Sequence, residues 1–282
     1  MKLGVLTDIH LCPPGSPPDG WHNPHQFETV AERLERAMAW LAARGVDQVA
    51  VLGDLSHMGD AASLRAVVDI LGASGLQTWV LPGNHDLVPD PVALATAVAD
   101  AGHDHVRLLD GAAIPFGPTW QVAGLVMVRA ETGGFRADPE PEMDAWGERP
   151  TVLLAHYPVL SIRDDAAAAN LKYAGDLANG EPQADALRQR PAPTLIVHGH
   201  LHIRHATASG SALQASCGAQ VESLFEVTVF DLGGWDDGRV SWQATAIQDI
   251  WPGVNPALSD PTQSWRWSGS AWTPDRFATG FP

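Results

Sequence analysis

The chain has 282 residues, of which 45% are hydrophobic and 18% are charged. This balance excludes an intrinsically disordered chain, and the length allows one large α/β domain or two smaller ones. The 33 acidic residues outnumber the 17 basic residues, so the formal net charge is −16. Because such a charge repels polyanions at long range, we do not expect duplex nucleic acid as a partner.

The cysteine content and the N-terminal sequence indicate the compartment. Cys12 and Cys217 are the two cysteines of the chain, too few for a disulfide framework, and this favours a reducing compartment. A bridge between the two stays open at this point. The N-terminus lacks the apolar stretch of a signal peptide, and no run approaches the length of a membrane span. We therefore expect a soluble, cytoplasmic protein that does not associate with membranes.

Five short apolar runs each end in polar residues. They cover residues 3–6, 49–52, 78–81, 152–155 and 195–197. Short apolar runs bounded by turn residues are typical of strands buried on both faces, as in sheets that are covered by helices.

Helical patterns separate the first three runs. A helix is expected to begin with Asn23 as its N-cap and Pro24 at its first position, and to end before Gly45. Its apolar stripe consists of Phe27, Val30, Leu34, Met38 and Leu41. Further helices are expected over residues 61–71 and 91–101. The alternation of strand and helix predicts βαβ units in the first third of the chain.

After about residue 104 the pattern changes to closely spaced strands. Strand-like runs cover residues 120–128, 211–216, 225–230 and 240–247, and polar stretches at 131–150 and 162–190 are expected to form loops or short helices. The Trp-rich segment from Trp251 shows no clear period. We expect a catalytic domain over residues 1–250 and an irregular C-terminal arm over 251–282, which packs on the domain or forms a homo-oligomer contact.

The polar residues at the ends of the five runs are candidate metal ligands. They are Asp8, His10, Asp54, Asn84, His85, His156, His200 and His202. In mostly parallel sheets such groups gather beyond the carboxyl ends of the strands. Nitrogen and oxygen ligands without thiolate favour Mn, Fe, Co, Zn or Ni over Ca or Mg. Without His85, seven ligands exceed the needs of one ion, whereas two ions about 3.5–4 Å apart that share Asp54 would use them all.

In these motifs the sequence resembles the calcineurin-like metallophosphoesterases. The motif blocks are Asp8-Ile9-His10, Gly53-Asp54, Gly83-Asn84-His85-Asp86, His156 and Gly199-His200-Leu201-His202, in the family's order within residues 1–230. The resemblance implies a mixed α/β fold, a four-layer αββα sandwich in which two mixed β-sheets pack face to face with helices outside.

The resemblance also implies a role for each motif residue. One metal ion would bind Asp8, His10, Asp54 and His202, and a second would bind Asp54, Asn84, His156 and His200. His85 would be the catalytic imidazole, held by Asp86. The cofactors would be two divalent ions per chain, chosen from Mn, Fe, Zn and Co.

The expected activity is hydrolysis of small phosphodiesters, cyclic nucleotides included, by metal-bound hydroxide. The arginine that follows Gly-Asp in protein Ser/Thr phosphatases is missing after Asp54, and His156-Tyr157-Pro158 is similar to a segment of bacterial cyclic-nucleotide and glycerophosphodiester phosphodiesterases. Two alternatives stay open: a phosphomonoesterase of the same superfamily, and a non-catalytic metal-binding scaffold.

Several other residues lie beside the motifs. His57, His198 and His205 are interpreted as ordinary polar residues, with hydrogen bonding to a metal ligand as the alternative. Surface packing is favoured over a substrate pocket for Trp21, His22 and His25. A solvated helical surface is favoured over substrate binding for Arg163, Asn170, Lys172 and Tyr173.

Overall fold

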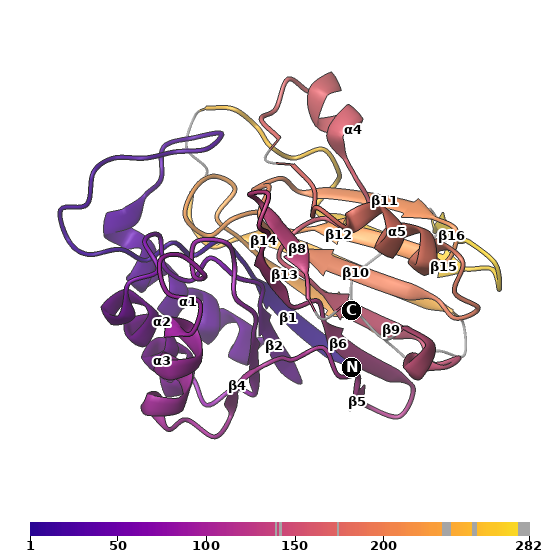
Figure 1. Cartoon of the computed structure of the whole chain (residues 1–282), viewed down its shortest axis with the longest axis horizontal. Coiled ribbons are helices and arrows are strands. Elements are labelled where there is room, and N and C mark those ends of the chain that lie inside the picture. Colours follow the sequence, from indigo (N-terminus) through magenta and orange to yellow (C-terminus); the bar gives the residue numbers. More distant parts are fainter. Residues whose placement is uncertain (139, 141–142, 174, 233–237, 250–252, 276–282) are drawn as a thin grey trace.

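The computed structural model describes residues 1–138, 140, 143–173, 175–232, 238–249 and 253–275. Within these residues two large mixed sheets, one of eight strands and one of six, pack face to face with helices outside them. Figure 1 shows these layers. The expected four-layer α/β architecture is confirmed.

The eight-stranded sheet contains the N-terminal strands. Its strands are β1 (Lys2–Leu6), β2 (Gln48–Val51), β3 (Thr78–Val80), β4 (Val106–Leu108), β13 (Glu226–Asp231), β14 (Arg239–Ala246), β15 (Thr262–Trp267) and β16 (Trp272–Pro274). They lie in the order β16-β15-β14-β13-β1-β2-β3-β4. β1 to β4 are parallel, and β13 pairs antiparallel with both β1 and β14.

The six-stranded sheet has a parallel centre. Its strands are β5 (Ile114–Phe116), β6 (Trp120–Gly124), β9 (Thr151–Leu154), β10 (Thr194–His198), β11 (His205–Ser209) and β12 (Ala212–Ser216), in the order β11-β12-β10-β9-β6-β5. β6, β9, β10 and β12 run parallel. The run at 120–128 is two elements, because β7 (Met127–Arg129) leaves this sheet and forms a separate ribbon with β8 (Phe135–Ala137).

The helices lie outside the two sheets. They are α1 (Val30–Ala43), α2 (Ala61–Ala73), α3 (Ala93–Ala101), α4 (Arg163–Ala168) and α5 (Gly180–Arg188), with 3-10 turns at Phe27–Thr29 and Met143–Trp146. α1 to α3 pack on the eight-stranded sheet and α5 packs on the six-stranded sheet. Figure 1 shows them on opposite sides of the molecule. Among the described residues, every helix is too short or too polar to cross a bilayer.

The two faces of the eight-stranded sheet bury alternate residues of β1. Leu3 and Val5 of β1 face the six-stranded sheet, whereas Leu6 packs with α1 and α2 on the other face. All three side chains are at most 1% exposed. Each buried aliphatic side chain of this kind contributes roughly 1.5–3 kcal/mol. Burial on both faces therefore holds β1 firmly at the centre of the fold.

The first helix begins later than the sequence predicts. A 3-10 turn precedes α1, whose N-cap Thr29 makes no capping hydrogen bond through its side chain. The expected cap, Asn23, bonds instead to the backbone N–H and carbonyl of Val254. The amide is therefore used in a tertiary contact. The helix does end before Gly45, whose φ is 62°, and its predicted stripe from Val30 to Leu41 is buried.

The Trp-rich C-terminal segment is more regular than expected. β15 and β16 extend the eight-stranded sheet beyond β14. Trp265 and Trp267 are two positions apart on β15 and pack toward the core between the sheets, together with Trp272 of β16. Trp251 lies outside the described residues, and the domain boundary at residue 250 stays a prediction.

Replacing Trp265 tests whether this segment belongs to the core. Trp265 is 8% exposed, so Trp265→Ala should lower the free energy of unfolding by roughly 3–5 kcal/mol. Val254→Ala, at a side chain that is 48% exposed, is the matched control and should change it by less than about 0.5 kcal/mol. Urea unfolding followed by circular dichroism measures both. An unchanged urea midpoint for Trp265→Ala would show that the segment is an appendage.

Candidate metal centre

The candidate residues meet where parallel strands of both sheets end. Asp8 and His10 follow β1, Asp54 follows β2, and Asn84 and His85 follow β3. His156 follows β9, and His200 and His202 follow β10 in the opposite sheet. Six of these residues line one cavity of 450 Å³: His10, Asp54, Asn84, His85, His200 and His202.

Left-handed backbone conformations direct these side chains toward one another. Five candidate ligands have φ between 51° and 65°: Asp8, His10, Asp54, His200 and His202. They are five of the seven non-glycine residues with positive φ in the described part of the chain. Because this conformation is uncommon for residues with a Cβ and costs free energy, its concentration here marks a functional site.

Two motif glycines let neighbouring segments approach closely. A Cβ at Gly199 would lie 1.8 Å from the Thr7 hydroxyl, and one at Gly83 would lie 2.1 Å from Oδ1 of Asp54. Neither position has room for a side chain. Gly199 therefore lets the β10 loop of one sheet touch the β1 loop of the other, and Gly83 lets the β3 loop touch the neighbouring β2 loop.

The first ligand group contains Asp8, His10 and His202, whose ligand atoms all lie within 4.8 Å of one another. Nε2 of His202 is 3.6 Å from Oδ1 of Asp8. The backbone N–H of His200 donates to the Asp8 carboxylate, as does the Thr7 hydroxyl. The group can therefore present two imidazoles and one carboxylate to a cation.

The second group contains Asp54, His156 and His200, again within 4.8 Å. Nε2 of His156 lies 3.4 Å from Oδ2 of Asp54 and 3.0 Å from Oδ1 of Asn84. The same Asp54 oxygen is 3.5 Å from Nε2 of His10, a member of the first group. Asp54 thus lies between the two groups.

These residues fit a pair of divalent cations. Nε2 of His10 and Nε2 of His200 are buried without a hydrogen-bond partner, which is costly unless something else binds them. Asp8 and Asp54 are 0% and 2% exposed, and within the described residues their ion-pair partners are histidines. The site therefore places unpartnered imidazole nitrogens beside two buried carboxylates.

Hydrogen bonds behind the site orient two of the imidazoles. Nδ1–H of His156 donates to the Leu52 carbonyl at 2.7 Å, and Nδ1–H of His202 donates to Oε1 of Glu222 at 2.5 Å. Each bond directs Nε2 of the ring toward a buried carboxylate of the site. Glu222 could not be found from the sequence, because it lies in the loop between β12 and β13 and no local pattern marks it.

A third imidazole is oriented by a longer chain of contacts. Nδ1 of His10 lies 3.2 Å from Nδ1 of His57, and Nε2 of His57 lies 3.2 Å from the Asp19 carboxylate. When His10 uses Nε2 as a ligand, its Nδ1–H donates to His57, whose Nε2–H donates to Asp19. His57 therefore takes the role that the sequence analysis gave as the less favoured alternative.

The structure corrects the expected pairing of His85 with Asp86. Nδ1–H of His85 donates to the His57 carbonyl at 2.6 Å. The buried Asp86 carboxylate accepts three backbone N–H groups instead, from Leu55, Ser56 and Gly83. Asp86 therefore joins the β2 and β3 loops and does not hold the imidazole.

Burial and charge divide the histidines into two classes. Burial holds the pKa of His10 and that of His200 well below the ordinary value. Burial by itself would also lower the pKa of His156 and of His202, but nearby carboxylates more than offset it. Asp54 raises the pKa of His156 to about 9, and Asp8 with Glu222 raises the pKa of His202 to about 10.

The cavity wall contains residues that the sequence analysis assigned to the surface. Trp21, His25 and Lys172 line it, and the Lys172 ammonium lies 5.4 Å from the centre of the Trp21 ring and donates to the Trp21 carbonyl. They arrive on loops whose position depends on tertiary contacts. His22 instead donates through its Nε2–H to the Leu201 carbonyl at 2.9 Å.

Comparison with known proteins agrees with this geometry. The sequence profile of the calcineurin-like phosphoesterases matches residues 1–204. The chain belongs to the calcineurin-like phosphoesterase family. Members of this family are metal-dependent phosphoester hydrolases that generally bind a dinuclear divalent metal centre. No curated protein matches the sequence significantly.

Solved structures share the phosphoesterase fold at low sequence identity. A dimetal phosphatase from Danio rerio is 12% identical with a TM-score of 0.61, over 90% of this chain and 98% of that one. The protein TT1561 of Thermus thermophilus is 14% identical with a TM-score of 0.53, over 88% and 99%. A putative 5'-nucleotidase from Staphylococcus aureus is 12% identical with a TM-score of 0.53, over 89% and 55%.

Replacing Glu222 should weaken metal binding. Glu222→Gln removes the negative charge behind His202. Loss of such a hydrogen-bond partner typically lowers metal affinity by about 10–100-fold, and we expect a decrease of this size. Glu226→Gln is the matched control, because Glu226 is similarly buried but pairs with Arg204. Competitive metal titration with a chromogenic chelator measures both variants. Equal affinities for the two would show that Glu222 does not support a ligand.

Metal binding should release protons. In the metal-free protein His156 and His202 are protonated at pH 7, since their pKa values are about 9 and about 10, and an imidazolium must lose its proton to bind a metal. Affinity should therefore rise with pH and level off above these pKa values. Calorimetric titration in buffers of different ionisation enthalpy counts the protons. A heat that is independent of the buffer would mean that both imidazoles are already neutral.

Proposed function

We propose that this phosphoesterase hydrolyses small phosphodiesters in preference to phosphomonoesters. The observation that carries the proposal is the convergence of both ligand groups on one cavity, where Lys172 is the one lysine or arginine among the described lining residues. A phosphomonoester dianion carries one more negative charge than a diester, and no other described residue of the lining has a fixed positive charge to offset it. Apart from the metal ions, the lining thus offers one fixed positive charge, which supports a monoanionic diester over a dianionic monoester.

The residues of the chain divide the work as follows. Asp8, Asp54 and the imidazoles would hold two divalent ions, which would lower the pKa of bound water and offset the charge of the phosphoryl oxygens. Lys172 and Trp21, on the wall of the same cavity, offer a cation and an aromatic face to one ester arm. Low exposure of the ligands limits competition from solvent.

His85 would assist the departure of the alcohol. Its backbone N–H donates to Asp54 at 2.9 Å, and its Nδ1–H is held by the His57 carbonyl, so the ring is fixed in the cavity with Nε2 available. A protonated Nε2 can give its proton to the leaving oxygen as the ester bond to phosphorus breaks. His85 thus needs no metal contact to contribute.

A substrate panel tests the proposed class. Protein loaded with Mn²⁺ should turn over bis(4-nitrophenyl) phosphate and a cyclic nucleotide with higher kcat/KM than 4-nitrophenyl phosphate. A preference for the monoester would establish the phosphatase alternative. Metal bound at two per chain with no turnover of any ester would establish the scaffold alternative.

The leaving group decides how much His85 contributes. His85→Asn should lower kcat on an alkyl diester by about 10²–10⁴-fold, the usual value of general acid catalysis. The loss on a nitrophenyl diester should be much smaller, because nitrophenolate leaves without protonation. Elemental analysis serves as the control and should show the wild-type metal content. Equal losses on both diesters would instead assign His85 to charge stabilisation at the phosphoryl group.

A further inference from the structure

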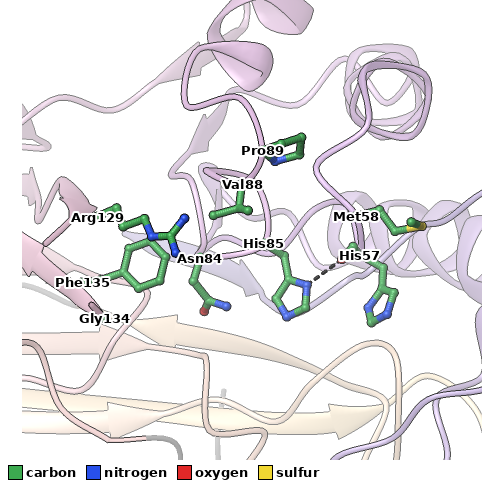
Figure 2. A pocket seen from close by; sticks show the side chains of 9 residues that line it. All are labelled: His57, Met58, Asn84, His85, Val88, Pro89, Arg129, Gly134 and Phe135. Atoms are coloured by element: carbon green, nitrogen blue, oxygen red, sulfur yellow. Dashed lines mark hydrogen bonds between the residues drawn. The ribbon is translucent and has the colours of Figure 1, made fainter. Parts of the chain in front are cut away.

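A second cavity of 440 Å³ adjoins the metal centre. Its lining shares His57, Asn84 and His85 with the cavity described above. Figure 2 shows Arg129 and Phe135 at one end of it, His57 and Met58 at the other, and Asn84 and His85 between them. A volume of this size suits a small organic group. The two cavities therefore meet at the residue that is positioned to protonate a leaving group.

The second cavity exposes apolar side chains to solvent. Met58 is 54% exposed and Val88 is 38% exposed, and they are two of the five exposed large hydrophobic residues within the described part of the chain. Phe135 adds a half-buried ring, whose centre lies 5.8 Å from that of the Tyr157 ring. Tyr157 in turn stacks on His200 at 3.7 Å. An apolar ligand would cover this surface and would lie against a ring that is packed on the metal centre.

Arg129 gives the same cavity a positive charge. Its side chain is exposed at the end of β7, and no carboxylate of the described residues pairs with it. Arg136, on the other strand of the same ribbon, does pair with Asp138. In a chain with a net charge of −16, an unpaired guanidinium beside an apolar surface attracts an anionic group.

We propose that this cavity binds the leaving group of the diester. It selects a leaving group that has an apolar body and one negatively charged substituent. The inference rests on the proposed function. Water adds to phosphorus and loses one proton to solvent, the bond from phosphorus to the leaving oxygen breaks, and protonated His85 gives that oxygen its proton. His85 then regains a proton from solvent. The products are a phosphomonoester and an alcohol. Because His85 lines both cavities, an alcohol whose oxygen is at His85 extends into the second cavity, where Arg129 meets its charge.

Two diesters with the same retained methyl group test the selection. They are methyl 4-nitrophenyl phosphate and its 3-carboxy-4-nitrophenyl analogue, and the quantity compared is the kcat/KM of the carboxylated ester divided by that of the other. Arg129→Ala should lower this ratio by about tenfold, the effect of losing one charge-assisted hydrogen bond. Arg136→Ala should leave the ratio and both activities unchanged. If Arg129→Ala leaves this ratio unchanged, whether or not both activities fall, the inference is overturned.

A binding measurement separates this inference from the proposed function. The leaving group alone, 5-hydroxy-2-nitrobenzoate, should bind the metal-free protein in ligand-observed NMR titrations, and Arg129→Ala should weaken its binding by about tenfold. If the wild-type protein hydrolyses neither diester, the proposed function fails and this titration decides the inference. Equal binding to wild-type protein and to Arg129→Ala would overturn it.

Discussion

Two buried carboxylates, Asp8 and Asp54, require positively charged partners at this end of the molecule. Removing a carboxylate from water costs several kcal/mol unless a partner compensates it, and in the described residues the ion-pair partners are imidazoles alone. Two of the four surrounding imidazoles, His10 and His200, are kept neutral by burial. Without metal, protonated His156 and His202 therefore balance the two carboxylates, and divalent cations would replace these protons.

A second layer of acidic groups lies behind the imidazoles. Glu222 contacts His202 directly, and Asp19 contacts His10 through His57. A carboxylate behind a ligating imidazole fixes its ring and raises its basicity. These two acidic residues thus orient imidazoles of the site, whereas from the sequence alone the acidic composition indicated only which partners to exclude.

The strand ends and the ligand candidates could be predicted because they are local features. Each central strand is buried on both faces, so its apolar run is continuous, and the polar residue at its end is visible in the sequence. The bounds of the first helix could not be predicted, since Asn23 bonds to Val254, 231 positions away. The local sequence does not distinguish an asparagine that caps a helix from one that makes a tertiary contact.

Residues delivered by loops were the least predictable part of the site. Glu222 and Lys172 each depend on where a connecting segment packs, and neither periodicity nor motif spacing contains that information. Adjacency in sequence was also misleading for Asp86, because its side chain turns toward backbone N–H groups and not toward the His85 ring. The β15 tryptophans alternate correctly for a strand, but two residues are too few to establish a period.

The strand order of the eight-stranded sheet also has a consequence for biosynthesis. β1, which leads into Asp8 and His10, lies between β2 and β13, and β13 ends at Asp231. A nascent chain therefore contains Asp8 and His10 long before it contains β13, which pairs with β1. Glu222, which orients His202, is also synthesised late. The ribosome must release most of the chain before the centre can close. Metal would then bind a chain in which both sheets have already formed.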